Sequence, residues 1–211
     1  MKRTAIAILA TLLTMASTSF AATQVTGAAV TTVAPTMQVK VNVLRAVSLT
    51  LATGATAPLH CAVTSPGPTD YTMDFGTVDA MGINAGNCNQ FKPATPGTND
   101  AIYWSDYQLV PVYTSHKVFA GTTITAQVTG DFAAPHNVFI VRDSANSAAV
   151  PANAAAMTPM GVAAADTIGA AGVVSGTALT RYIGVGIHPT NSATEQSGAL
   201  TATVTFTLTV Q

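Results

Sequence analysis

The last residues of the chain alternate strictly between apolar and threonine side chains. From Leu200 onward every even position is apolar and every odd position up to Thr209 is threonine. A period of two places successive side chains on opposite faces of a β-strand, and β-branched threonine suits the solvated face. The pattern predicts a final β-strand with one buried and one wet face, and therefore an antiparallel β protein. The predicted buried face consists of Leu200, Ala202, Val204, Phe206, Leu208 and Val210.

An apolar strand at the edge of a sheet also exposes backbone groups that another chain can pair with. The identity of the segment that covers this strand therefore bears directly on function. If a neighbouring subunit covers it, the even-numbered row becomes the wall of an acceptor groove. The wall residues of that hypothesis are Leu200, Val204, Phe206, Leu208 and Val210.

The first 21 residues have the pattern of a secretory signal peptide. Lys2 and Arg3 form a basic start, a short apolar run follows, and Ser19 and Ala21 place small residues before the expected cut. The apolar run is too short to span a bilayer, and no later segment is long and apolar enough. We therefore expect a secreted chain that acts outside the cell or at its surface and is not an integral membrane protein.

Charged residues make up 8% of the chain, against about 25% in ordinary globular domains. The 8 basic and 9 acidic residues form no basic patch, which argues against nucleic acid and anionic membranes as partners. So few charges also give little protection against self-association. Two interpretations remain open: a surface solvated by hydroxyl groups, or a surface buried against copies of the same chain.

The two cysteines, Cys61 and Cys88, belong to the part of the chain that is expected to be exported. In an oxidising compartment such a pair forms a disulfide. A thiol nucleophile or a metal pair is the weaker alternative, because the chain has no Cys-x-x-Cys motif and no histidine at ligand spacing.

Further strands are expected where apolar alternation or β-rich runs are bounded by turn residues. The segment 37–51 alternates on odd positions but is interrupted at Arg45, which indicates a bent strand or two strands. Cys61 and Cys88 fall in the expected loops 54–68 and 82–100, and a long Ala/Gly-rich loop that contains one or two weak strands is expected over 144–172. The pattern predicts one domain, 37–211, with an immunoglobulin-like or jelly-roll β-sandwich fold. The other expected strands cover 71–78, 102–113, 122–128, 138–142 and 179–187.

Sequence motifs for catalysis are absent. The four histidines are scattered, and there is no nucleophile elbow or phosphate-binding loop. We therefore predict a protein that is not an enzyme and has no cofactor and no metal. A calcium site near Asp70, Asp74 and Asp79 is a weaker alternative to ordinary roles for these carboxylates in turns.

Three aromatic residues, Tyr103, Trp104 and Tyr107, lie close together in the expected strand 102–113. Aromatic faces bind the apolar faces of sugar rings, so this group is a candidate carbohydrate platform. A sandwich also needs large core residues, and we favour the core role.

Two N-terminal segments have the properties of a donated β-strand, which must be extended, alternating and free of bulky side chains. The extension 22–36 contains one, and residues 37–43 are the alternative; the sequence does not decide between them. Alternatively, 22–36 is a leader and 37–51 pairs within its own domain. The candidate donor residues are Val25, Gly27, Ala29, Thr31 and Val33 in the first segment, and Met37, Val39, Val41 and Val43 in the second.

Two groups of residues resemble secreted pilin-like domains. The first is Asp74-Phe75-Gly76-Thr77-Val78, which follows an alternating segment ending in Ser48-Leu49-Thr50-Leu51. The second is Tyr182-Ile183-Gly184-Val185-Gly186-Ile187, followed by Gln196-Ser197-Gly198-Ala199 and the final strand. Over about 37–79 and 178–211, the chain is similar to spore-coat-U-like proteins and related fimbrial subunit families.

The resemblance implies an exported subunit that polymerises by donor-strand exchange. Its implied partners are copies of itself, other pilus subunits and a periplasmic chaperone. The leading hypothesis is therefore a structural subunit of an extracellular filament or pilus. A secreted carbohydrate-binding module or surface adhesin is the alternative.

Overall fold

The computed structural model describes residues 37–41, 46–55, 60–65, 67, 70–84, 86–91, 95, 97–114, 122–130, 132, 137–144, 147–170, 173–189 and 198–210. The expected signal peptide, the extension 22–36 and Val43 lie outside these residues. The chain divides into two units, Met1–Val43 and Leu44–Gln211. In the first unit, residues 37–41 have no regular secondary structure, and Met37, Val39 and Val41 are 85%, 82% and 82% exposed.

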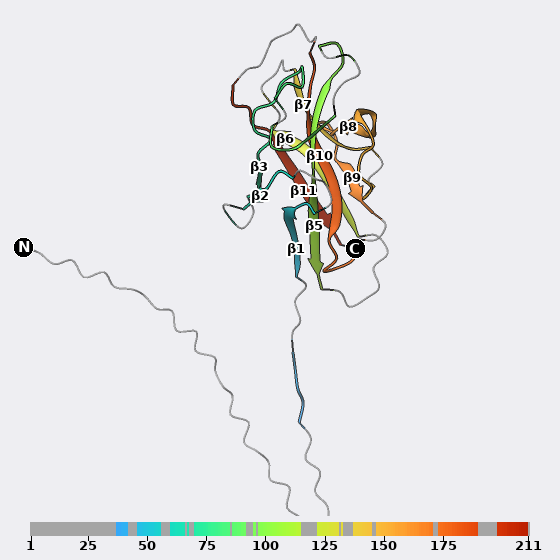
Figure 1. Cartoon of the computed structure of the whole chain (residues 1–211). Coiled ribbons are helices and arrows are strands. Elements are labelled where there is room, and N and C mark those ends of the chain that lie inside the picture. Colours follow the sequence, from blue (N-terminus) through green and yellow to red (C-terminus); the bar gives the residue numbers. More distant parts are fainter. Residues whose placement is uncertain are drawn as a thin grey trace, which may run out of the picture. The chain divides into compact units, whose positions relative to one another are not determined.

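The second unit is an all-β domain built from antiparallel sheets (Figure 1). Its largest sheet has six strands in the order β1-β5-β10-β7-β8, with β4 also paired to β5. These strands are β1 (Val47–Thr53), β4 (Asn89–Phe91), β5 (Ala101–Tyr113), β7 (Val138–Asp143), β8 (Met157–Pro159) and β10 (Leu179–Ile187).

A three-stranded sheet has the order β11-β6-β9, and a two-stranded sheet pairs β2 with β3. Their strands are β2 (Val63–Thr64), β3 (Thr72–Met73), β6 (Thr123–Gly130), β9 (Asp166–Gly169) and β11 (Thr203–Thr209). The only helical turn in the described part of the chain is the 3-10 turn η1 (Ala154–Ala156). Over the same residues, no helix is long and apolar enough to cross a membrane.

The six-stranded and three-stranded sheets pack face to face, as expected for a β-sandwich. Tyr107 and Leu109 from β5 form one buried cluster with Ile124, Ala126 and Val128 from β6. The inward residues of β1, β10 and β11 pack against the same cluster. Sheet faces from both layers therefore share one apolar core.

The expected strands are largely confirmed. β10 has the bounds expected from the sequence, and β5, β6, β7 and β11 differ from them by a few residues. Pro111 lies in β5 beyond Leu109, where pairing with β10 ends, so its missing N–H costs no bond to β10.

Some observed strands differ from the expected ones, because their bounds depend on pairing with distant segments and a short stretch of sequence does not encode that pairing. The strand expected over 37–51 begins only at Val47, and the one expected over 71–78 is reduced to β3. Conversely, β2 and β4 form inside segments expected to be loops.

The two faces of the six-stranded sheet are chemically different. On β10, Ile183, Val185 and Ile187 pack into the interior, whereas Gly184 and Gly186 lie on the opposite face. That outer face has its own buried cluster, which contains Ile102, Trp104, Val141, Met157 and Tyr182.

The outer face of the three-stranded sheet consists of neutral polar side chains. Thr205, Thr207 and Thr209 of β11 lie opposite Gln127, Thr125 and Thr123 of β6. The hydroxyl groups of Thr129 and Thr205 are 2.8 Å apart and share a hydrogen bond. This confirms that threonine occupies the wet face of β11.

Candidate functional site

A large open groove runs beside β11. It has a volume of about 2030 Å³, which exceeds the roughly 300–1,000 Å³ of a typical small-molecule pocket. We call it the β11 groove. One wall is formed by residues 198–206, which include the first part of β11, and the other by residues 70–80 and parts of β1 and β2.

The floor of the β11 groove is the inner face of the six-stranded sheet. It is almost entirely apolar, so an occupant that covers it would remove apolar surface from water. The floor residues are Tyr107, Val138, Ile140, Ile183, Val185 and Ile187.

β11 is an edge strand. Among the described strands it pairs only with β6. In an antiparallel strand, backbone N–H and C=O groups alternate between the two edges, so one edge of β11 is available for a further strand. The inward side chains are only partly buried, since Val204, Phe206 and Leu208 are all of intermediate exposure.

The expected acceptor wall divides into two parts. Leu200, Val204 and Phe206 line the β11 groove, and the Phe206 ring packs on Tyr107 with centroids 5.6 Å apart. Leu208 instead packs against the central core. Val210 is partly buried and is not among the residues that line the groove.

The opposite wall is stabilised by polar contacts made by two aspartates. Asp74 accepts a hydrogen bond from the N–H of Gly76, at 2.8 Å. Asp79 accepts hydrogen bonds from the N–H groups of Met81, Ile83 and Asn84, at 2.8, 3.1 and 2.6 Å. These carboxylates thus act as turn-forming groups.

Tyr103 links this wall to the sheet. Its hydroxyl donates to the carbonyl oxygen of Asp79 at 2.7 Å and accepts from the Asp79 N–H at 3.3 Å. Burial raises the pKa of the Tyr103 hydroxyl, so it stays protonated and able to donate.

The first candidate donor, with Val25, Gly27, Ala29, Thr31 and Val33, lies outside the described residues. In the second, Met37, Val39 and Val41 expose their apolar side chains, and Val43 is outside the described residues. The structure therefore leaves the choice between the two segments open.

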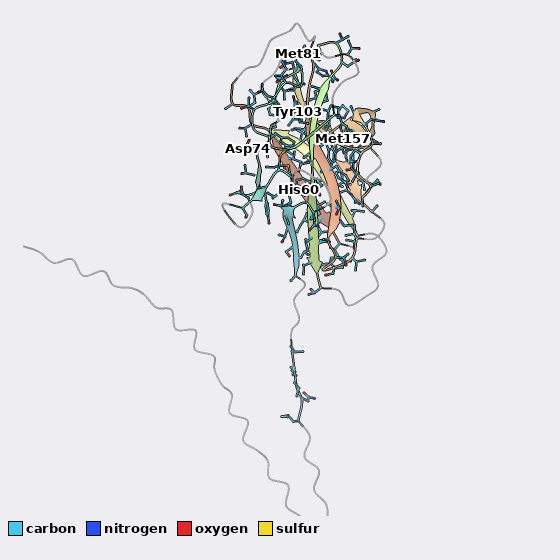
Figure 2. All side chains as sticks on the ribbon, in the orientation of Figure 1. His60, Asp74, Met81, Tyr103 and Met157 are labelled. Carbon is cyan, nitrogen blue, oxygen red and sulfur yellow. A yellow bond between two sulfur atoms is a disulfide. The ribbon has the colours of Figure 1, made fainter. Side chains whose placement is uncertain are left out.

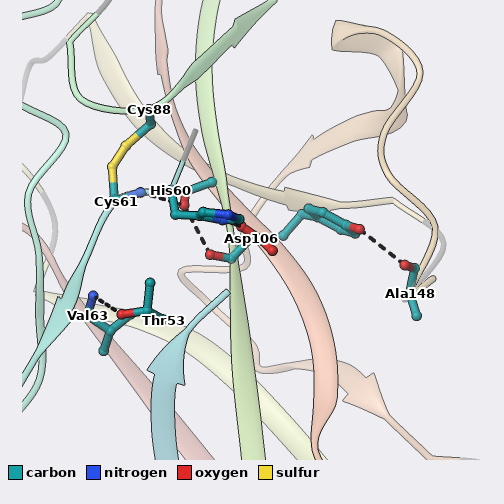
Figure 3. A network of polar contacts seen from close by, with 9 residues as sticks. Thr53, His60, Cys61, Val63, Cys88, Asp106 and Ala148 are labelled. Atoms are coloured by element: carbon teal, nitrogen blue, oxygen red, sulfur yellow. Dashed lines mark hydrogen bonds and ion pairs between the residues drawn. A yellow bond between two sulfur atoms is a disulfide. The ribbon is translucent and has the colours of Figure 1, made fainter. Parts of the chain in front are cut away.

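The predicted disulfide between Cys61 and Cys88 is present, with a Cα–Cα distance of 5.3 Å (Figure 3). It lies where one edge of β5 lacks a strand, because β4 pairs with residues 102–104 and β1 with residues 107–113. At this gap, the N–H of Cys61 donates to Ser105 Oγ at 3.0 Å. Next to it, His60 Nδ1 pairs with the carboxylate of Asp106.

Asp106 was not anticipated as a structural residue. Its side chain is fully buried, whereas that of His60 is 27% exposed. A buried carboxylate is costly unless it is paired, so the contact with His60 helps to position the chain at the disulfide. The available sequence signal was a single charged residue in a strand that is otherwise uncharged.

The aromatic residues of β5 belong to the core. Tyr103, Trp104 and Tyr107 are 0%, 4% and 2% exposed. The preferred core interpretation is therefore confirmed, and these rings do not form a surface platform for sugar.

Other charged groups also have structural partners. Arg142 pairs with Asp166, with 3.0 Å between Nε and Oδ2. This hydrogen bonding lowers the pKa of Asp166. Burial raises the pKa of Asp143. Across the described ranges, no group of three or more His, Cys, Asp or Glu side chains is arranged to hold a metal ion.

Comparisons of the chain with protein-family models, curated proteins and solved structures found no match. The likeness to spore-coat-U-like and fimbrial proteins therefore rests on the short motifs described above.

Proposed function

We propose that this protein is a structural subunit of an extracellular filament or pilus, which polymerises by β-strand donation between identical subunits. The observation that carries the proposal is the β11 groove, an apolar floor bordered by an edge strand. An extended segment of a second copy would pair with the backbone of β11 and place alternate side chains on that floor.

The donor comes from the N-terminal region. Residues 37–43 match β11 in length, since β11 has 7 residues, and Met37, Val39 and Val41 provide exposed apolar side chains on alternate positions. Residues 25–33 provide smaller side chains with the same period. A short donor strand that leaves its own domain and enters the next joins subunits head to tail, and such contacts give open filaments unless the rotation closes a ring.

Export and low charge also support the proposal. The expected signal peptide directs the chain out of the cytoplasm, and a chain with 8% charged residues presents little electrostatic repulsion between copies.

The donor is tested with the mature chain, which begins at Ala22, and with variants of it. Their assembly is examined by size-exclusion chromatography and negative-stain electron microscopy. The complete mature chain is expected to form fibres. Deletion of 22–36 abolishes fibres if this segment is the donor. The double variant Val39→Asp/Val41→Asp abolishes them if the donor is 37–43. A mature chain that stays monomeric, or fibres that persist in both variants, would overturn the proposal.

The acceptor is tested on β11 itself, with two lysine substitutions on opposite faces. Val204 lines the groove, whereas Thr207 is exposed on the other face. Val204→Lys is expected to prevent fibre formation, because a charge on the groove wall is desolvated when a donor covers it. Thr207→Lys should leave fibres intact. Equal assembly of the two folded variants would contradict strand addition at β11.

A further inference from the structure

A second cavity, independent of the β11 groove, opens on the outer face of the six-stranded sheet. Its volume is about 730 Å³, within the range of roughly 300–1,000 Å³ that is typical of small-molecule sites. We call it the outer pocket. Strands β5, β7 and β8, the turn η1 and the residues next to the paired ends of β5 and β10 contribute to it.

Glycines in β10 allow the neighbouring strands to pack closely beside the outer pocket. Gly186 lies between Ile102 of β5 and Phe139 of β7, and Gly184 lies between Trp104 and Val141. The ring of Phe139 leans into the space above Gly186, where an added Cβ would lie 2.2 Å from Phe139 Cζ.

The floor of the outer pocket is apolar and firmly packed. Ile102, Val141 and Met157 line it and are 6%, 0% and 5% exposed. They belong to the buried cluster of the outer face, so the floor is already formed without a ligand.

One end of the outer pocket is polar. His188 Nδ1 lies 2.6 Å from Asp100 Oδ1, and the imidazole ring stacks on Phe139 with centroids 4.3 Å apart. The Asp100 and His188 side chains are 42% and 41% exposed, so a ligand can reach them. Asn99 and Asn153 also line the outer pocket, and each has a side-chain amide.

These groups select a ligand by charge and shape. Among the residues that the structure describes, no lysine or arginine lines the outer pocket, so an anion would face Asp100 without a strong cationic partner from them. A carboxylate and two amides offer both acceptors and donors to neutral hydroxyl groups. An apolar floor with an aromatic ring suits the C–H face of a sugar. We infer that the outer pocket binds a neutral pyranose unit of a carbohydrate.

This inference does not depend on filament formation. The β11 groove lies against inward residues of β7, Val138 and Ile140, whereas the outer pocket lies over outward residues of the same strand, Phe139 and Val141. In Figure 2, Asp74 of the groove wall and Met157 of the pocket floor lie on opposite sides of Tyr103. In a polymer, the pocket would repeat once per subunit and raise avidity for a multivalent glycan.

The first test is saturation-transfer NMR on the mature chain with the methyl glycosides of glucose, galactose, mannose and N-acetylglucosamine. At least one glycoside is expected to bind saturably with a Kd of about 1 mM. No binding by any of the four would overturn the inference.

Variants then locate the site. Ala155 lines the outer pocket and Ala152, in the same segment, does not, and both are exposed. Ala155→Trp should abolish binding because the indole fills the cavity, and Ala152→Trp should leave binding unchanged. Asp100→Asn should weaken binding by about tenfold, since it removes a charged acceptor.

Circular dichroism confirms that each variant is folded. Binding that survives both Ala155→Trp and Asp100→Asn would overturn the inference. A second result would also overturn the inference: no glycoside binds, but indole binds saturably and Asp100→Asn does not change its affinity. The outer pocket would then be a purely apolar site. Neither result would affect the proposed filament, because its assembly is measured separately.

Discussion

Gly186 lies directly opposite Phe139 across β10 and β7, and the Phe139 ring occupies the space where a side chain at position 186 would begin. Gly186→Ala should therefore destabilise the domain by about 1–3 kcal/mol, the usual cost of overpacking. Urea denaturation measures this loss. In the background Phe139→Ala the same substitution should cost much less, because the ring is gone. An equal cost in both backgrounds would show that the ring is not the cause.

His60→Ala should lower the free energy of unfolding by about 1–3 kcal/mol, because it removes one partner of the fully buried Asp106 carboxylate. His188→Ala is the matched control, since His188 also pairs with an aspartate but both side chains of that pair are more than 40% exposed. Its cost should be well below that of His60→Ala. Equal losses in thermal unfolding would contradict a special role for burial at Asp106.

Removal of the disulfide should destabilise the domain without changing its fold. For a sequence separation of 27 residues, the chain-entropy model gives a loss of about 3–4 kcal/mol. Cys61→Ser/Cys88→Ser tests this by guanidinium denaturation, with the oxidised wild-type chain as reference. Wild-type protein treated with a reductant should approach the same stability. An unchanged midpoint in both samples would indicate that the bridge adds no stability.

Asp166 should make stability depend on pH in the acid range. Hydrogen bonding to Arg142 lowers the pKa of Asp166 below its ordinary value of 3.8. The unfolded chain then binds more protons between the two pKa values, so this stabilisation is complete above 3.8 and is lost as pH falls through the folded-state pKa. Asp166→Asn should cost about 1–2 kcal/mol at neutral pH, and the difference from wild type should vanish at low pH.

Unfolding curves between neutral pH and about pH 2 measure that difference, with Asp70→Asn as an exposed control. A deficit for Asp166→Asn that stays constant down to the lowest pH would mean that the carboxylate's charge is not responsible.

The strands with long, regular patterns could be predicted from the sequence. The alternation at 200–210 predicted β11 and its wet threonine face, and the run from Leu179 to Ile187 predicted β10. Both segments encode their structure locally, through side-chain period and β-branched residues. The two cysteines similarly predicted their own pairing.

The sites depend on contacts between distant segments and could be predicted only in part. Leu200, Val204 and Phe206 were expected in the groove wall. The opposite wall, residues 70–80, could not be predicted, because its position depends on its turns and on the hydrogen bond between Tyr103 and Asp79. The outer pocket was missed because strand register brings Asp100 and Phe139 together across β10.

The threonine and glutamine face of the three-stranded sheet carries no ionisable group at the paired positions 123, 125, 127, 205, 207 and 209. The groups that bind water on this face are therefore hydroxyls and amides, which neither titrate nor attract counterions. This side of the molecule should keep the same affinity for water in acid and in brine. On the proposed extracellular filament, the chemistry of this face would stay constant while the pH and the salt concentration of the medium change.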